Sequence, residues 1–382
     1  MNDSPSGREG KRVSDDFAKL RDEIAAIDQA MVELLERRFR LAETVGRIKA
    51  ERGRPVVVRE VERRVLARAR NAAKLCGVSP EMMEAIFTSI IHGSVERQHR
   101  VGVEMGMGTS SHVLIVGAAG AMGGWLRRFL ENIGHTAEGV DPSWAGLRPH
   151  AGRYGCLDDV ADFSSFDAIF ISVPLDTTGE ALKEMARRDL KIPVFEIASI
   201  KDHLRDALDD LRLKGTPTIS LHPMFGPDKN PYGPLTMVHA VVGDEEAERE
   251  QILALLAHPY LDLVSVPFER HDRTMGWLLG LAHLTGMLFA EALSHSGLDP
   301  HELGRAASTT FARQMATAHS VLSEDPALYF SIQRLNPFRG EIYAALNAAL
   351  GGLTGAVERN KPEEFAELLA RAADALPERD VS

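Results

Sequence analysis

The stretch HVLIVGAAGAMGG, residues 112–124, decides the fold of the central part of this chain. It predicts a short β-strand, a glycine turn with Gly117, Gly120 and Gly123, and the start of a helix. A second predicted strand ends at Asp141, about twenty residues further on. Glycines let backbone amides approach a pyrophosphate at a helix N-terminus, and the following acid takes the ribose hydroxyls. This order predicts a Rossmann domain that binds a dinucleotide.

The same region indicates which dinucleotide is bound. Further strands are predicted at residues 168–173, 194–198, 218–221 and 240–242. The turn departs from strict glycine spacing at Ala118, and it includes Met122, which we expect among the cofactor contacts. Asp141 is followed by Pro142 and Ser143 with no arginine, so a 2′-phosphate would meet a carboxylate and no cation. The pattern favours NAD over NADP.

Composition limits the class of protein. The chain has 382 residues, of which 44% are hydrophobic and 26% charged, and this length predicts two or three globular domains. A net charge of -11 argues against a nucleic-acid partner. The polar start, expected to be disordered over its first dozen residues, and the lack of an apolar run near ~20 residues predict a cytoplasmic protein with no membrane partner. The two cysteines, Cys76 and Cys156, have no metal-site spacing, so no metal is expected.

The first hundred residues predict a helical module with one very long helix. Apolar residues recur at a spacing of three and four: Phe17, Leu20, Ile24, Ile27, Met31, Leu34, Leu41, Val45 and Ile48. We expect this helix to begin after Ser14 as N-cap and to stop at Gly53 and Pro55. At ~55 Å it exceeds a compact domain of ~90 residues, so its far half needs another chain. With shorter helices over 59–76 and 80–100, the module predicts an interlocked all-α dimer.

Polar residues interrupt the apolar seam of this module. Arg38 occupies the seam position between Leu34 and Leu41, and a charge buried there must be paired. Arg38 could pair with a nearby glutamate, Glu33 or Glu36. Alternatively it could join further polar residues that the helical pattern places near the seam: Arg21, Lys49, Ser94 and Gln98. Three cations and two neutral hydrogen-bonding groups would suit a small dianion.

The segments LRDEIAAIDQAMVELLERRFRLAETVGRIKAERGRPV (20–56) and IIHGSVERQ (90–98) resemble the all-helical chorismate mutase family. The resemblance implies a pericyclic rearrangement of chorismate to prephenate, which needs orientation and charge stabilisation but no nucleophile. It implies a pocket of six residues: Arg21 from the partner subunit, Arg38 and Lys49 for the carboxylates and ether oxygen, and Glu62, Ser94 and Gln98. The chain has Val61 where the family usually has arginine and Val58 where many members have aspartate, so we expect a mutase that is less efficient than relatives with this arginine.

A second candidate site is the run LHPMFGPD, residues 221–228. His222 lies between a strand and a series of prolines and a glycine, which predicts a rigid loop beyond the edge of the sheet. Such loops often carry catalytic residues. A histidine there could also be merely structural or exposed.

This run and the motifs VGAAGAMGG (116–124), ISVP (171–174), ASIK (198–201), ERHDRTM (269–275) and a serine five residues before Arg313 resemble the prephenate dehydrogenase family. The resemblance implies oxidative decarboxylation of prephenate with NAD, with His222 as the base and Ser199 orienting it or the substrate hydroxyl. It implies that Arg313 binds a carboxylate, and it adds Ser172 and Pro174 to the cofactor contacts. His271 and His283, twelve residues apart on one predicted helix, could line the pocket or be structural.

The expected organisation is therefore multidomain: an all-α mutase module at 12–101, an α/β Rossmann domain at 111–244 and an all-α dimerisation domain at 245–377. Residues 100–111 are the expected linker, and LNPFRGEI (335–342) is expected to break two helices. The small-molecule substrates are chorismate and prephenate, and a homodimer is expected through both helical modules. Two alternatives stay open. The chain could act on the 4-amino analogues, or its mutase-like module could be an inactive effector-binding or dimerisation domain.

Overall fold

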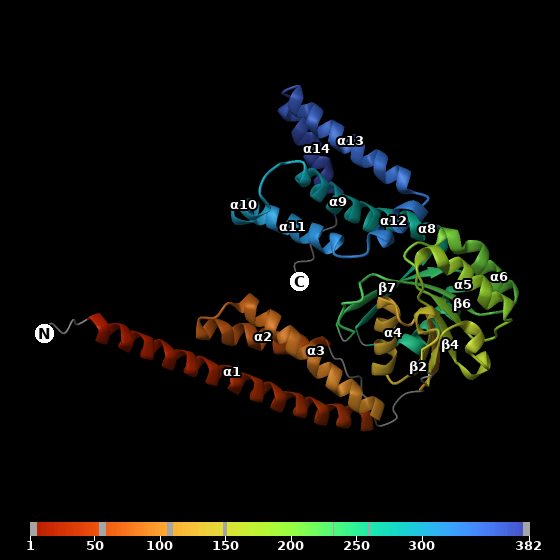
Figure 1. The fold of residues 1–382 in the computed structure, drawn as a ribbon, viewed down its shortest axis with the longest axis horizontal. Coiled ribbons are helices and arrows are strands. Elements are labelled where there is room, and N and C mark those ends of the chain that lie inside the picture. The colour runs from red at the N-terminus through yellow and green to blue at the C-terminus, as the bar shows by residue number, and fades with distance from the viewer. Residues whose placement is uncertain are drawn as a thin grey trace.

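The computed structural model describes residues 6–52, 59–104, 110–147, 151–231, 233–258 and 260–376. Three helices come first, a sheet domain follows, and a set of helices ends the chain (Figure 1). This order agrees with the predicted multidomain organisation.

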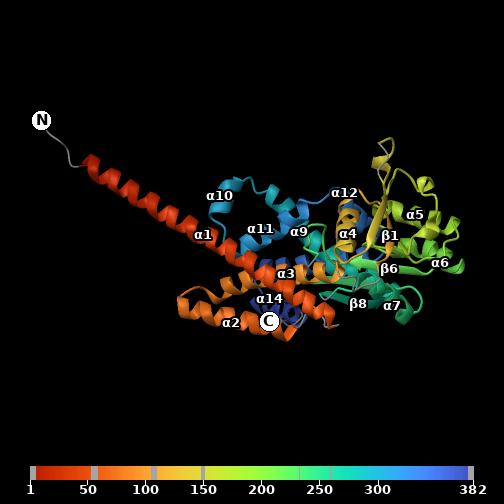
Figure 2. The same cartoon turned by 90° about the horizontal axis from the view of Figure 1, so that it is seen from below.

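The N-terminal module consists of α1 (Ser6–Glu51), α2 (Arg59–Cys76) and α3 (Pro80–Glu104). The N-terminal half of α1 extends away from the rest of the chain in both views (Figures 1 and 2). Its apolar seam is exposed along the whole helix, from Phe17 at 59% through Leu41 at 61% to Ile48 at 44%. At the crossing, a Cβ on Gly46 would lie 2.8 Å from the Cα of Gln98, so only glycine permits this approach. Within one chain, the other helices of the module do not cover the apolar seam of α1.

Two details of this module differ from the expectation. Ser14 is not the N-cap, because α1 already begins at Ser6; the intervening residues include Arg, Glu and Lys, which are good helix formers. The third helix continues to Glu104, so the linker is shorter than expected. The predicted bounds of α2 are confirmed. Val58 lies outside the described residues.

The sheet has eight strands in the order β3-β2-β1-β4-β5-β6-β7-β8. Their bounds are β1 His112–Val116, β2 Thr136–Val140, β3 Arg153–Tyr154, β4 Ala168–Ile171, β5 Val194–Glu196, β6 Thr218–Pro223, β7 Leu235–Val241 and β8 Leu261–Pro267. All neighbours are parallel except β6 and β7. The buried residues form two clusters, one of which includes α4 (Ala121–Asn132) and α7 (Glu245–Leu256), and the other α5 (Leu175–Arg187) and α6 (Arg205–Leu213). The sheet is doubly wound.

Two expectations about the end of the sheet are wrong. Residues 245–376 were expected to be helical, yet Leu261–Pro267 form β8, paired with β7 along its whole length. Half-buried and exposed side chains mostly alternate along β8, as on an edge strand, and this short pattern is easily missed between helices. The sheet therefore ends at Pro267 and not at residue 244. His222 lies in β6, opposite Val238, and not in a loop, because the antiparallel ladder continues to Pro223.

The C-terminal helices begin with a continuous run made of α8 (Phe268–Met275), a π-helical segment (Gly276–Gly280) and α9 (Leu281–Ser294). Five helices follow: α10 (Pro300–Arg305), α11 (Thr309–Leu322), α12 (Pro326–Leu335), α13 (Arg339–Glu358) and α14 (Pro362–Asp374). The predicted break between helices lies between α12 and α13. Phe268–Ser294 is long and apolar enough to cross a membrane by length and composition alone. Apolar residues are exposed here, with Phe330 at 66% and Leu350 at 63%, and exposed apolar surface of this kind is typical of interaction sites.

Candidate active sites

His222 is one end of a buried chain of three side chains, with His271 in the middle and Asp272 at the other end. Its Nδ1 lies 3.2 Å from Nε2 of His271, whose Nδ1 lies 2.7 Å from Oδ1 of Asp272. The carboxylate can only accept, so His271 Nδ1 is the donor to Asp272. In a neutral ring, His271 Nε2 is then an acceptor, and His222 Nδ1 must carry the proton between the two rings. Nε2 of His222 is consequently left with its lone pair, as a general base requires.

The surroundings keep both rings neutral. Burial lowers the pKa of His222 well below its ordinary value, and the neighbouring His271 and Lys201 add to this. Burial also lowers the pKa of His271, although the hydrogen bond to Asp272 opposes this. Partial desolvation opposes ionisation of Asp272, but hydrogen bonds from His271 and from backbone amides outweigh it and lower its pKa. Both imidazole rings are therefore neutral, and the carboxylate of Asp272 at the end of the chain is ionised.

A buried ion pair between Lys201 and Glu196 helps to hold these three side chains in position. Lys201 Nζ donates to Glu196 Oε1 at 2.6 Å and to the carbonyl of Leu221 at 2.7 Å, directly before His222. Ser220 Oγ donates to the same Glu196 oxygen. The amide of Lys201 donates to Asp272 Oδ1 at 2.8 Å. Lys201 therefore contacts both the strand beside His222, through its side chain, and Asp272, through its backbone. These hydrogen bonds offset the cost of burying two charges.

Three of the residues expected around His222 make no described contact with it. Ser199 is partly buried after β5, and no described hydrogen bond links it to His222, whose ring contacts His271 instead. His283 lies on α9, 4.6 Å from the Tyr329 ring, and its buried Nδ1 has no partner among the described residues. Arg313 is exposed on α11. The roles expected for these three residues stay predictions. Among the expected residues, only His271 is shown in contact with His222.

The glycine turn is compact because two of its residues could not carry a side chain. Gly117 has a positive φ of 87°, and a Cβ there would lie 2.3 Å from the carbonyl oxygen of Ser172. A Cβ on Gly123 would lie 2.1 Å from the Gly117 oxygen. The Ser172 hydroxyl is buried without a partner among the described residues. A tightly folded turn without side chains at these two positions and the unsatisfied hydroxyl of Ser172 beside it fit a dinucleotide site.

Asp141 connects this turn with the end of β2. Its Oδ2 accepts from the amide of Ala119 at 3.0 Å, and its Oδ1 accepts from the amide and hydroxyl of Ser143 at 3.0 and 2.6 Å. Partial burial opposes its ionisation, but these hydrogen bonds outweigh it and lower the pKa of Asp141. An ionised carboxylate at this position would accept hydrogen bonds from ribose hydroxyls and repel a phosphate.

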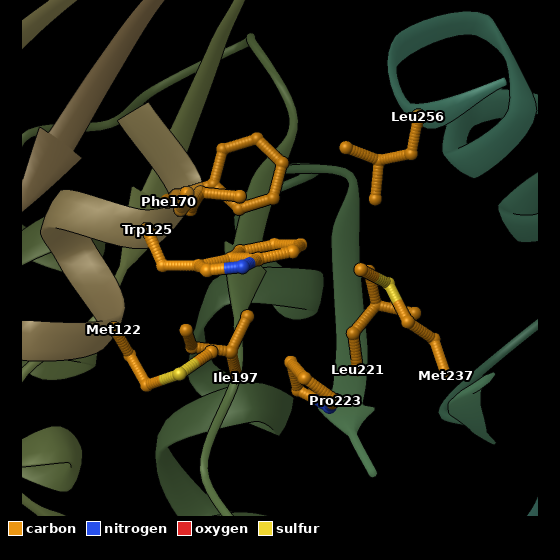
Figure 3. Close-up of a pocket in the computed structure, with 9 residues that line it drawn as sticks. Met122, Trp125, Phe170, Ile197, Leu221, Pro223, Met237 and Leu256 are labelled. Carbon is orange, nitrogen blue, oxygen red and sulfur yellow. The ribbon is translucent and has the colours of Figure 1, made fainter. Parts of the chain in front are cut away.

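Apolar side chains fill the space between α4 and the sheet. A cavity of about 10 Å³ remains there, walled on one side by Met122 and Trp125 and on the other by Leu221 and Pro223 (Figure 3). It is too small for a ligand and is a packing void. Through these side chains α4, the helix that follows the glycine turn, packs against β6, the strand that carries His222.

The second polar cluster lies where α1 crosses α3. Arg38 Nη1 donates to the hydroxyl of Ser94 and to the carbonyl of Ile90, the latter at 3.2 Å. Gln98 Nε2 donates to the Ser94 carbonyl at 3.2 Å, and its buried Oε1 has no partner among the described residues. Burial lowers the pKa of Arg38, and among the described residues only its Nη1 has hydrogen-bond partners. A bound anion would offset this desolvation.

Two more expected residues adjoin this cluster, and one does not. Burial lowers the pKa of Lys49, and the charge of Glu62 opposes that shift, so the two lie close together. Arg21 lies seventeen positions before Arg38 on the same helix, about 25 Å along its axis. One chain therefore brings together Arg38, Ser94 and Gln98, with Lys49 and Glu62 nearby, but not Arg21. Val61 is 46% exposed on α2.

A glycine turn, an acid after β2 and a neutral histidine at a strand end define a dinucleotide-dependent dehydrogenase, preceded by a helical anion-binding module. Family models match in the same order. The chorismate mutase type II model matches residues 20–99, the prephenate dehydrogenase nucleotide-binding domain 128–239, and the prephenate dehydrogenase dimerization domain 267–371. The chain belongs to the prephenate dehydrogenase family and carries a type II chorismate mutase domain in front of it. It is an isomerase fused to an NAD-dependent oxidoreductase of tyrosine biosynthesis, as the sequence predicted.

Individual relatives are distant. The T-protein of Enterobacter agglomerans is 26% identical over 321 residues, covering 83% of this chain and 81% of that protein. The 4-amino-4-deoxyprephenate dehydrogenase of Streptomyces pristinaespiralis is 27% identical over 272 residues, covering 69% and 91%. The solved prephenate dehydrogenase of Aquifex aeolicus, in complex with hydroxyphenyl propionate and NAD+, has a TM-score of 0.56 at 20% identity and covers 69% and 96%. This last likeness concerns the fold alone.

Proposed function

We propose that the pocket around Arg38 rearranges chorismate to prephenate and that His222 initiates the oxidative decarboxylation of prephenate to 4-hydroxyphenylpyruvate. The observation that carries the second step is the Asp272–His271–His222 chain, which leaves one unprotonated nitrogen at the end of β6. We also propose a homodimer through both helical modules and a cytoplasmic location. The match to the prephenate dehydrogenase dimerization domain supports dimerisation.

The dehydrogenase residues have one proton to handle. Nε2 of His222 removes the proton of the C4 hydroxyl as the C4–H bond breaks and its electron pair leaves as hydride. The turn of Gly117 and Gly123 would hold NAD, whose nicotinamide would supply the hydride acceptor. The C4 carbonyl then takes up the electron pair of the breaking bond to the ring carboxylate, which leaves as carbon dioxide. The ring becomes aromatic, and the proton held by His222 returns to the phenolate oxygen.

The mutase residues hold and polarise a dianion. Arg38 and Lys49 would neutralise the carboxylates and the charge that develops on the ether oxygen, while Gln98 and Glu62 would supply hydrogen-bonding groups. Arg21 lies too far along α1 to reach the same ligand, so we assign it to the pocket of the partner subunit. The exposed apolar seam of α1 is the surface that would pair the two chains.

The deciding experiment supplies chorismate and NAD to the full chain and follows NADH, carbon dioxide and 4-hydroxyphenylpyruvate together. Equal amounts of all three are expected, after a lag in which prephenate accumulates. NADH without carbon dioxide would contradict the proposed reaction. Because one relative is named for a 4-amino-4-deoxyprephenate, 4-amino-4-deoxychorismate is the comparison substrate. A higher kcat/KM for this amine would move the chain to the amino pathway.

NAD should be used in preference to NADP. The carboxylate of Asp141, held by Ala119 and Ser143, would repel a 2′-phosphate, whereas in Asp141→Ala the repulsion is lost together with the ribose contact. The variant is expected to lose NAD affinity and to narrow the NAD to NADP ratio of kcat/KM by about tenfold or more. Steady-state kinetics with both cofactors measure this. Equal use of the two cofactors by the wild type would refute the placement of Asp141.

The dehydrogenase should remain active well into the acid range. Its base works unprotonated, and burial, His271 and Lys201 hold the pKa of His222 well below 6.5. The acid limb of kcat/KM for prephenate is therefore expected well below pH 6.5, with a flat region from there to about pH 8. A pH-rate profile at saturating NAD tests this. A limb at or above 6.5 would mean that the working base is not a buried His222.

Mixed subunits should restore the mutase. Arg21→Ala and Arg38→Ala are each expected to be nearly inactive, because each removes one arginine from both pockets of the dimer. If Arg21 crosses to the partner, co-refolded or co-expressed chains form mixed dimers with one intact pocket, and statistical mixing predicts about a quarter of the wild-type activity. If both arginines served the same chain's pocket, no activity would return on mixing.

A further inference from the structure

We propose that Tyr260, a residue of the dehydrogenase sheet, positions Glu62 in the mutase pocket and so makes the mutase dependent on the domain fused behind it. The tyrosine hydroxyl donates a hydrogen bond to Glu62 Oε1 across 2.5 Å. The inference rests on the proposed function, in which Glu62 belongs to that pocket.

The tyrosine is fixed to the dehydrogenase domain by its backbone. It immediately precedes β8, and its carbonyl accepts a hydrogen bond of 2.9 Å from the amide of Leu235, at the start of β7. Its ring lies 6.0 Å from that of His258, which in turn lies 5.7 Å from Phe129 on α4. The phenol is therefore carried by the sheet and by the helix that follows the glycine turn.

On the mutase side, Tyr260 contacts two helices. Its hydroxyl reaches Glu62 on α2, and its ring lies edge-on to His92 of α3, with the ring centres 5.5 Å apart. Two residues after His92, Ser94 binds Arg38. A single side chain of the neighbouring domain thus spans the two helices that form one wall of the anion-binding cluster.

The chemistry of the contact suits a positioning role. Burial, and then the hydrogen bond and charge of Glu62, raise the pKa of Tyr260, so the phenol stays protonated and acts as a donor. The bond occupies Oε1 of Glu62 and leaves Oε2 without a hydrogen bond from the described residues. One carboxylate oxygen is then held by the protein while the other is able to accept a hydrogen bond from the substrate. Without Tyr260, Glu62 would lose this restraint.

The test replaces one hydroxyl in the full chain. Tyr260→Phe keeps the ring contact with His92 and is expected to lower the mutase kcat/KM for chorismate about three- to tenfold. Dehydrogenase activity on added prephenate reports folding in the same sample and should be unchanged. Tyr154→Phe is the matched control, because Tyr154 also donates to a glutamate, Glu138, but within the sheet domain. Its mutase rate should equal that of the wild type.

A double-mutant cycle separates positioning from packing. If Tyr260 acts through Glu62, Tyr260→Phe should cost almost nothing further in a Glu62→Gln background. Equal losses in both backgrounds would overturn the inference and leave Tyr260 as a packing residue. So would an unchanged mutase rate in Tyr260→Phe while Glu62→Gln is impaired. If Glu62→Gln itself keeps full mutase activity, the proposed pocket is wrong, and the inference falls with it.

Discussion

Replacement of His222 by asparagine is expected to lower the dehydrogenase kcat by about 10²–10⁴, the usual contribution of a general base. Asparagine keeps a polar side chain of similar size at the end of β6, but it cannot take up the proton of the C4 hydroxyl. Proton transfer to His222 stabilises the transition state but does not contribute to binding of the substrates. Prephenate and NAD should therefore still bind. The expected signature is a large fall in kcat with little change in KM.

Two measurements accompany this prediction. The mutase rate of His222→Asn should equal that of the wild type, since the pocket around Arg38 lies in another domain, and it shows that the chain is folded. His295→Asn is the control for loss of a histidine as such, because His295 is exposed at the end of α9 and pairs with Glu291 of that helix. Retention of the rate in His222→Asn would remove His222 from the mechanism.

Local patterns in the sequence predicted most of the fold. The bounds of α2 were predicted correctly, because helical patterns act over one or two turns of helix. The glycine turn and Asp141 were predictable because a dinucleotide imposes them at fixed spacing along the chain. The excess length of α1 was equally predictable, since helix length depends only on the number of residues.

Contacts between segments that are far apart in the sequence were harder to predict. His271 was a candidate, but its bond to His222 joins β6 to α8, and no local pattern encodes this pairing. The same holds for Asp272 and Lys201, although the motifs ERHD and ASIK contain them. Tyr260 has no signal at all in the sequence, because its partner Glu62 belongs to another domain. β8 was missed because a short edge strand next to helices carries a weak periodicity.

Replacement of Arg38 by alanine is expected to lower the mutase kcat/KM for chorismate by about two to three orders of magnitude. Charge-assisted hydrogen bonds to carboxylates contribute roughly 1.5–3 kcal/mol each, and a guanidinium is able to make two of them at once. Within the described part of the chain Arg38 uses one nitrogen, Nη1, for Ser94 and Ile90, which leaves its other donors for a ligand. Loss of the cation also leaves a dianion facing Glu62 with less compensating charge.

The matched control is Arg40→Ala. Arg40 lies two residues further along the same helix, is exposed and pairs with Glu36 four residues earlier, a surface contact worth little. Its mutase activity should therefore stay within about twofold of the wild type. Both variants should oxidise added prephenate at the wild-type rate, because the chain from Asp272 to His222 is untouched. If Arg38→Ala matched Arg40→Ala in mutase activity, Arg38 would be a structural residue of the α1–α3 crossing, and the substrate would bind elsewhere.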